Sequence, residues 1–467
     1  RWWVVAVYLV ATSFSSAYLI GGTSDGYRIS MQWMAMQLGD LIGLAAACLL
    51  FLPFFAGLRL TTAYEYLERR FGPRARAVAS LLFMGQTLLR TSLLVYAPAV
   101  ALAALLGWSV QTAIVATAVA ALLYSAAGGI GAVVWTDLVQ MAVIVFAVAY
   151  SLVVVAGDVP DGLGQLVGRA RAEGRLAWAN PGADPKDMRT LLGAAVPYAV
   201  FAFSLFGTGQ QAVQRFLSVR DLAAARRAAL LGWGVGAATI CLTLFLGACL
   251  ASWAEIREAP LLGPKDDPNA VLPHFIGGRL PAGIAGLLLA AIFAAAMSSL
   301  DSAIHSMSTA FLVDFRRRYR RAPPGAGGEL REARICTAAF GLLAMVGALY
   351  AAKHAGARGL LETMATWLGY FAGPLLGLFL LGVLFRRATE AGALTGVAAA
   401  FLGVVGYVWL VPEPFARFHP LWLVPASCAV TLGLGLLGSL AGPPPDPPSL
   451  KGLTWRDRPG RPSGGAL

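Results

Sequence analysis

The residues best suited to bind an ion lie in the stretch Ala290 to Asp314, which reads AAIFAAAMSSLDSAIHSMSTAFLVD. Asp301 and His305 are one helical turn apart in it. On a helix of about 3.6 residues per turn, the neighbouring narrow face carries small and hydroxyl side chains, namely Ala295, Ser298, Ser299, Ser302, Ser306 and Thr309. Hydroxyl, carboxylate and carbonyl oxygens are the ligands that a small hard cation requires. The stripe predicts a cation site, with a close-packed contact between helices as the alternative.

Three further charged residues, Asp40, Arg90 and Asp137, lie inside long apolar runs. Each costs about 2.5–3.5 kcal/mol at the centre of a bilayer, so each needs a partner or a purpose. Arg90 has two interpretations. Its forked guanidinium could bind an anionic substrate, or it could form a structural ion pair with Asp40.

Two apolar runs are interrupted by glycine and polar residues. The first reads ATSFSSAYLIGGTSDGY and contains Gly21 and Gly22, and the second reads FSLFGTGQQAVQR and contains Gly207 and Gly209. They lie five apolar segments apart. Broken segments at matching positions of two halves are typical of an inverted-repeat transporter, because the freed carbonyl groups and helix ends become ligands. The alternative is that glycine is simply common in membrane helices.

The elements that must position these residues are membrane-spanning helices. The chain of 467 residues is 58% hydrophobic and only 13% charged, which excludes an ordinary soluble protein. The alternating pattern of a membrane barrel is absent, so the predicted class is an all-α polytopic membrane protein. A span of about 20 residues predicts twelve segments, at 3–28, 32–57, 75–106, 109–127, 130–156, 190–214, 223–253, 281–313, 332–352, 359–385, 391–411 and 421–441.

The loops between these segments predict the topology. Arginine clusters follow the second, sixth, eighth and tenth segments, and these loops fall on one side if every segment crosses. We therefore expect that side to be cytoplasmic, because positively charged loops remain in the cytoplasm. Both chain ends are then expected to be cytoplasmic too, and the protein is expected in the plasma membrane. The formal net charge of +12 therefore reflects membrane topology and predicts no nucleic-acid partner. No signal peptide is expected, since Arg1 leads straight into a helix, and the Pro/Gly-rich tail at 442–467 is expected to be disordered.

Four motifs resemble the sodium/solute symporter family, which includes sodium–glucose, sodium–proline, sodium–sialic acid and sodium–monocarboxylate cotransporters. They are TAYEYLERRFG from Thr62, GGIGAVVWTDLVQ, GTGQQAVQRFLSVRDLAAARR and AAAMSSLDSAIHSMSTAFLVDF. The resemblance covers nearly the whole chain. Two differences stand out: family members normally have one more helix before the Trp2-Trp3 pair, and many carry Asp where Gly209 stands.

The resemblance implies a leucine-transporter-type core of ten helices at 1–387, with inverted repeats at about 1–156 and 190–387. Accessory helices follow at 388–441. It implies a sodium site made by the carbonyl groups of Ala11, Phe14 and Ala295 and the hydroxyl groups of Ser298 and Ser299. Some members are similar in having a second sodium site, which here would combine Asp137 with Ser298, Ser302 and Asp301.

The expected function is sodium-coupled symport of a small organic solute, a carboxylate or an amino acid, across the lipid bilayer. The expected solute site combines Arg90 with Ser15, Ser16 and Tyr18 on the first helix and Gln210 on the sixth. Two alternatives stay open: a neutral solute such as a sugar, or a sensor of the same fold that binds without transport. An enzyme is not expected, because Ser302, Asp301 and His305 share one helix and form no catalytic triad.

Overall fold

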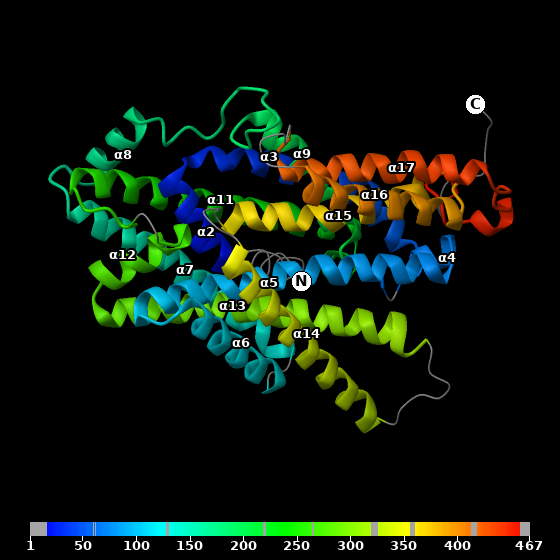
Figure 1. Ribbon diagram of the computed structural model, residues 1–467, viewed down its shortest axis with the longest axis horizontal. Coiled ribbons are helices and arrows are strands. Elements are labelled where there is room, and N and C mark those ends of the chain that lie inside the picture. The colour runs from blue at the N-terminus through cyan, green and yellow to red at the C-terminus, as the bar shows by residue number, and fades with distance from the viewer. Residues whose placement is uncertain are drawn as a thin grey trace.

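The computed structural model describes residues 16–58, 60, 62–127, 130–217, 221–263, 266–318, 326–354, 360–411 and 418–457. These residues form a bundle of long helices, and no strand occurs among them (Figure 1). The first half of the chain contains α2 (Ser16–Arg28), α3 (Ala35–Ala56), α4 (Glu65–Arg70), α5 (Pro73–Leu106), α6 (Val110–Ala127), α7 (Ile130–Gly157) and α8 (Gly162–Ala172). The second half contains α9 (Leu191–Thr208), α10 (Gln210–Leu217), α11 (Leu222–Ile256), α12 (Val271–Arg279), α13 (Ala282–Phe311), α14 (Ala326–His354), α15 (Leu360–Leu384), α16 (Glu390–Leu410) and α17 (Leu423–Leu440).

The predicted segments match these helices closely, and most limits agree within a few residues. Within the described ranges, eight helices are long and apolar enough to span a membrane, or nine if one sharply bent pair, at Met141–Gly157 and Gly162–Ala172, is counted as a span. Hydropathy located the helices because each backbone polar group in a bilayer must be satisfied within its own helix.

The packing of the helices is reciprocal between the two halves. α2 packs along α11, and α3 packs along α9, so the first helix of each half contacts the second helix of the other. In the same way, α5 contacts α13 and α6 contacts α14. This exchange of partners is what two inverted repeats produce, and it places α2, α5, α10 and α13 around the middle of the bundle.

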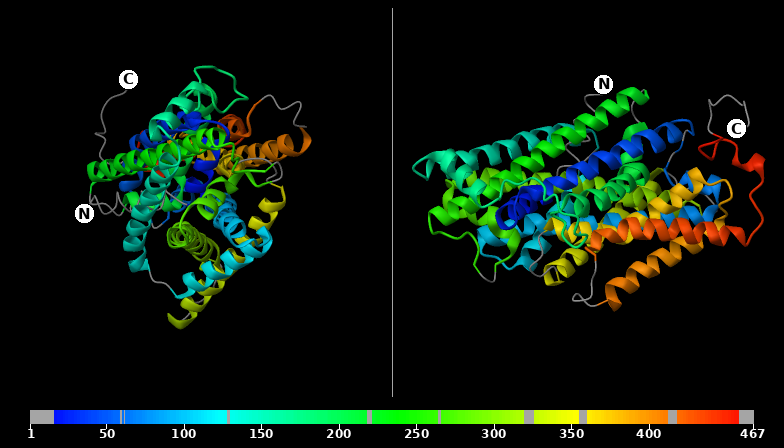
Figure 2. Two further views of the ribbon diagram at one scale, coloured as in Figure 1. Left: turned by 90° about the vertical axis from the view of Figure 1, so that its left-hand side faces the viewer. Right: turned by 90° about the horizontal axis from the view of Figure 1, so that it is seen from above.

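The two ends of the bundle differ. α8 and α12 lie at one end of the long axis, and α4 and the carboxyl end of the chain lie at the other (Figure 1; Figure 2, right). Helix α4 carries Arg69 and Arg70, and Arg316 lies at the end of α13. The sequence predicts that both of these arginine clusters lie on one side of the membrane. The basic end is thus the end that the arginine clusters predicted to be cytoplasmic.

The first predicted interruption differs from the prediction at its glycines. Gly21 and Gly22 lie inside the continuous helix α2, so neither is a break in the described part of that segment. A Cβ atom on Gly22 would lie 2.4 Å from Thr243 Oγ1, and one on Gly26 would lie 2.1 Å from the carbonyl oxygen of Leu244. Small residues in α2 thus allow close contact with α11.

The tail differs from the prediction as well. Residues up to Asp457 are placed and packed against the bundle, where the sequence predicted disorder from residue 442. The backbone N–H of Trp455 donates to the carbonyl of Val383 at 2.8 Å, and Tyr66 Oη donates to the carbonyl of Leu453 at 3.0 Å. Leu450 is buried. The tail therefore covers the end of α15, because a few buried contacts outweigh its Pro/Gly-rich composition.

The short helix α4 is docked rather than lying on the surface with a solvated face. Its Arg70 donates to four carbonyl groups in and just beyond the last turn of α15, those of Gly382, Phe385, Arg386 and Ala388. Carbonyl groups at a helix end have no partner within the helix, so the guanidinium caps α15. Burial raises the pKa of the Tyr66 hydroxyl, which lies beside it outside the membrane spans.

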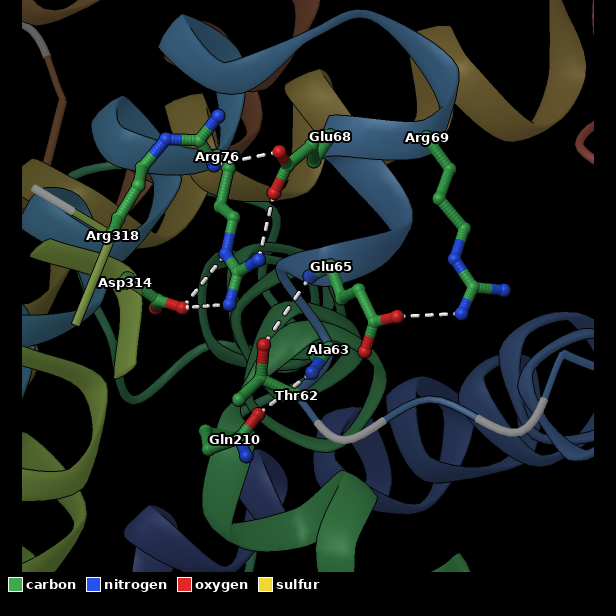
Figure 3. Close-up of polar contacts among 9 residues, drawn as sticks. All are labelled: Thr62, Ala63, Glu65, Glu68, Arg69, Arg76, Gln210, Asp314 and Arg318. Carbon is green, nitrogen blue, oxygen red and sulfur yellow. Dashed lines mark hydrogen bonds and ion pairs between the residues drawn. The ribbon is translucent and has the colours of Figure 1, made fainter. Parts of the chain in front are cut away.

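An ion-pair network joins α4, α5 and α13 at this basic end (Figure 3). Arg76 Nη2 lies 2.5 Å from Asp314 Oδ1, and Arg76 Nη1 lies 2.7 Å from Glu68 Oε2. Arg318 Nη1 contacts the other oxygen of Glu68 at 2.6 Å. The Asp314 side chain is fully buried and lies in the π-helical turn Leu312–Arg316 that ends α13.

This network makes a testable prediction about stability. Arg76→Met should leave the buried Asp314 carboxylate without its cation, a loss that typically costs about 3–5 kcal/mol. Arg318→Met is the matched control, because its pair with Glu68 is partly exposed and such pairs contribute about 0–1 kcal/mol. The measurement is thermal unfolding of the purified protein in detergent.

Adding Asp314→Leu to Arg76→Met should recover most of the loss, since no charge then stays buried. Equal melting temperatures for Arg76→Met and Arg318→Met would contradict the importance given to the buried pair.

Candidate functional site

A cavity of about 140 Å³ lies between α3, α5, α9, α10 and α11. Its polar lining comprises Tyr18, Gln37, Asp40, Gln86, Thr87, Arg90, Tyr198 and Gln211. The remaining wall is largely apolar and aromatic, with Phe83, Phe201, Phe206 and Trp233. An apolar pocket with a few convergent polar groups is the usual form of a small-molecule site.

Arg90 and Asp40 are the two charged residues among the described lining residues. Arg90 comes from the middle of α5, and Asp40 comes from the second turn of α3. Within the part of the chain that the structure describes, no ion pair of 4.0 Å or less joins them. The sequence left open a structural Arg90–Asp40 pair, and that alternative receives no support from the geometry.

Tyr18, which the sequence analysis assigned to the solute site, lies on the cavity wall beside Arg90 in the same lining. Its side chain shares a hydrogen bond with Tyr198 of α9, so the hydroxyl groups of the two halves of the fold meet there. Both tyrosines lie within electrostatic range of Arg90 and of Asp40. The tyrosine pair therefore belongs to the same polar part of the wall as the two charges.

Gln210 is placed differently from the prediction. Its side chain turns away from the cavity, and its Oε1 accepts a hydrogen bond of 2.7 Å from the backbone N–H of Ala63 (Figure 3). It is almost completely buried. In this structure Gln210 ties the loop before α4 to the start of α10, and its assignment to the solute site stays a prediction.

The neighbouring Gln211 occupies the cavity wall instead. Its Nε2 donates to the carbonyl oxygen of Ser302 on α13 at 3.3 Å. Sequence reasoning missed this residue, although the Gln-Gln pair beside the Gly209 break was visible. Gln211 joins the solute cavity to the helix that carries the hydroxyl stripe.

The hydroxyl stripe of α13 contains a buried group that fits a cation. Ala295 and Ser299 are both buried, and no described atom makes a hydrogen bond to Ser299 Oγ. Ser16, at the start of α2, is also fully buried, and its Oγ likewise has no hydrogen-bond partner among the described atoms. Helix α2 packs against α13. A buried hydroxyl group without a protein partner is costly, so a cation bound beside α13 would satisfy Ser299.

The residues of the expected second cation site are only partly described. Asp301 Oδ1 lies 3.0 Å from Nε2 of His305 on the next helical turn. A protonated His305 would therefore neutralise the Asp301 carboxylate. The carbonyl of Ser302 accepts from Ser306 Oγ at 2.7 Å as well as from Gln211. α7, which carries Asp137, contacts α13. The structure thus brings the two helices together, and the Asp137 side chain lies outside the described part.

Four other predicted site residues cannot be compared in this way. Ala11, Phe14 and Ser15 precede the first described residue, and the side chain of Ser298 is outside the description too. Their assignments stay predictions.

The sequence matches the family model named "Sodium:solute symporter family" over residues 1–400. A protein of Drosophila melanogaster named for sodium-dependent multivitamin transport is 31% identical, over 86% of this chain and 67% of its own length. The human sodium-coupled monocarboxylate transporter 1 is 29% identical, with 85% and 65% covered. The sodium/sialic acid symporter NanT of Aliivibrio fischeri is 28% identical, with 86% and 79% covered.

The chain therefore spans about two thirds of the length of the first two relatives. A solved structure of a Na⁺-coupled sialic acid symporter superposes with a TM-score of 0.81 at 23% identity, covering 95% of this chain and 90% of that one. The transporter Mhp1 superposes with a TM-score of 0.59 at 15% identity, with 96% and 95% covered. The predicted leucine-transporter-type fold is thereby confirmed, and the relatives are transporters, not enzymes.

The contrast between the two glutamines gives a second prediction. Gln210→Ala should lower stability by about 1–3 kcal/mol, because the Ala63 N–H is left buried without an acceptor. Gln211→Ala should leave the melting temperature of the purified protein nearly unchanged, since this side chain borders open space. Greater destabilisation by Gln211→Ala than by Gln210→Ala would contradict the two placements.

Proposed function

Because the chain belongs to the sodium:solute symporter family, we propose that it couples inward sodium movement to uptake of a small organic solute that carries a carboxylate. The observation that carries the proposal is the pairing of two features around α13: a buried, unpartnered Ser299 hydroxyl and an adjoining cavity with an unpaired Arg90. Gln211 connects the two through the carbonyl of Ser302.

Sodium is the proposed coupling ion at the α2–α13 contact. The proposed ligands are the carbonyl groups of Ala11, Phe14 and Ala295 and the hydroxyl groups of Ser298 and Ser299. The support is chemical: oxygen ligands suit a hard cation, and the buried Ser299 hydroxyl has no hydrogen-bond partner among the described protein atoms. Asp137 with Ser302 is the proposed second sodium site, and the His305 pair makes Asp301 the weaker candidate there.

Arg90 is the proposed anchor of the solute. A guanidinium binds a carboxylate through two parallel hydrogen bonds, which fixes the orientation of a small anion. Ser15, Ser16, Tyr18 and Gln211 are the proposed polar neighbours of the bound solute. The chain is a multi-pass membrane protein, and we place it in the plasma membrane with the arginine-rich end and both chain ends in the cytoplasm.

The sodium assignment predicts the behaviour of two matched serine variants. Ser299→Ala should raise the sodium concentration for half-maximal uptake roughly ten- to a hundredfold, because one ligand to a charged group typically contributes about 1.5–3 kcal/mol. Ser306→Ala is the control, since its hydroxyl already donates to the carbonyl of Ser302 on the same helix. Uptake into proteoliposomes, with potassium replacing sodium as the reference, is the measurement. Unchanged sodium dependence in Ser299→Ala would sink the assignment.

The solute assignment predicts that Arg90→Lys weakens carboxylate uptake strongly while the protein still folds. Lysine keeps the positive charge and loses the two-pronged geometry. The measurement is uptake together with the melting temperature, so that a folding defect is separated from a binding defect. If Arg90→Ala misfolds and Arg90→Ala with Asp40→Ala recovers both folding and transport, Arg90 is half of a structural pair instead.

A further inference from the structure

The cavity holds two opposite charges that do not neutralise each other. Arg90 and Asp40 both line it, and within the described chain neither makes an ion pair. Arg90 and Asp40 are each half-buried, whereas the buried charges at the basic end have partners: Asp314 contacts Arg76, and Arg70 contacts four carbonyl groups. The cavity is therefore the place where the fold leaves charges open.

A buried charge without a counter-charge is costly, and truncating one partner of a buried pair usually costs several kcal/mol. The fold could have removed that cost by letting Arg90 reach Asp40. Instead, both charges line the cavity together with the hydrogen-bonded Tyr18–Tyr198 pair. An occupant of the cavity can then meet both charges at once.

The aromatic part of the cavity wall suits a cationic group. Phe201 and Phe206 of α9 and Trp233 of α11 line the same cavity as Asp40. Trp233 is held in place by a hydrogen bond of 3.2 Å from its indole N–H to the carbonyl of Gln37, one turn before Asp40. Ammonium groups bind favourably over aromatic faces, particularly beside a carboxylate.

We propose that the solute is a zwitterion, with its carboxylate on Arg90 and its ammonium group on Asp40 among these aromatic side chains. This inference rests on the proposed sodium-coupled uptake of a carboxylate and narrows its substrate class. A simple monocarboxylate would leave the Asp40 charge without a counter-charge, and a neutral sugar would leave both Arg90 and Asp40 without one. Asp40 is not part of a metal cluster, because the described residues contain no group of three or more His, Cys, Asp or Glu side chains.

The test compares matched ligands on the wild-type protein. Alanine is paired with propionate, 4-aminobutyrate with butyrate, and trimethylglycine with 3,3-dimethylbutyrate, so that each pair differs in the cationic group. The purified full chain in lipid nanodiscs is titrated with each probe in sodium and in potassium, and binding is followed by the thermal shift. At least one zwitterion should bind about thirtyfold or more tightly than its anion partner, the usual effect of a buried charge pair.

The second arm uses Asp40→Asn, which keeps the size and removes the charge. It should lower the affinity for the preferred zwitterion about thirtyfold or more and leave the affinity of the matched anion unchanged or higher. Leu38→Ala is the control, as a neutral change on the exposed face of the same helix, outside the cavity lining. If Asp40→Asn does not fold, the comparison of matched ligands on the wild-type protein tests the proposal by itself.

Each outcome decides the proposal. Equal or tighter binding of the plain anions overturns the zwitterion and leaves sodium-coupled carboxylate uptake intact. A change in sodium dependence with unchanged ligand selectivity in Asp40→Asn also overturns it, since Asp40 would then bind an ion. Sodium-independent binding of every probe, or no binding of any carboxylate, would instead reject the proposed function itself.

Discussion

The structure depends on how the backbone polar groups freed at a helix break find hydrogen-bond partners inside a bilayer. The segment 191–217 stops at Gly209 and restarts at Gln210, which frees backbone groups that no lipid can hydrogen-bond. Tyr64 Oη donates to the carbonyl of Thr208 at 3.4 Å, and the carbonyl of Gly209 accepts from the N–H groups of Ala212 and Val213. Gln210 binds Ala63. The break is stable because the loop before α4 holds it, and the same break turns Gln211 toward the cavity.

Charges are treated differently at the basic end and in the cavity. At the basic end, Arg70 caps the carbonyl groups beyond α15, and Arg76 neutralises the buried Asp314, so helix ends from both halves are joined. In the cavity, Arg90 and Asp40 stay apart. The ion pairs at the basic end hold α4, α5 and the end of α13 together, whereas the unpaired charges in the cavity are available to an occupant. This division is consistent with a transporter, which must both close one end and bind a solute.

Several features were accessible to the sequence because they depend on local chemistry. The limits of α3, α5, α11, α16 and α17 follow from hydropathy, since a bilayer demands continuous apolar helices. The break at Gly209 was visible as well. By contrast, Gly21 and Gly22 looked like a second break and lie inside α2, where they allow contact with α11. Glycine marks both breaks and close packing in membrane helices, and only the partner helix distinguishes the two.

The sequence by itself determined the class of fold, the helix order and the polar stripe of α13. The tertiary structure decided which polar residues meet. Gln210 and Gln211 are adjacent in the chain, yet one binds Ala63 and the other borders the cavity and reaches Ser302. Consecutive residues on a helix point about 100° apart, so the rotation of α10, set by its packing, chooses between them. Packing likewise keeps Arg90 from pairing with Asp40. The distance between α5 and α3 beside these two residues is set by the packing of the whole bundle, and neither helix sequence determines it alone.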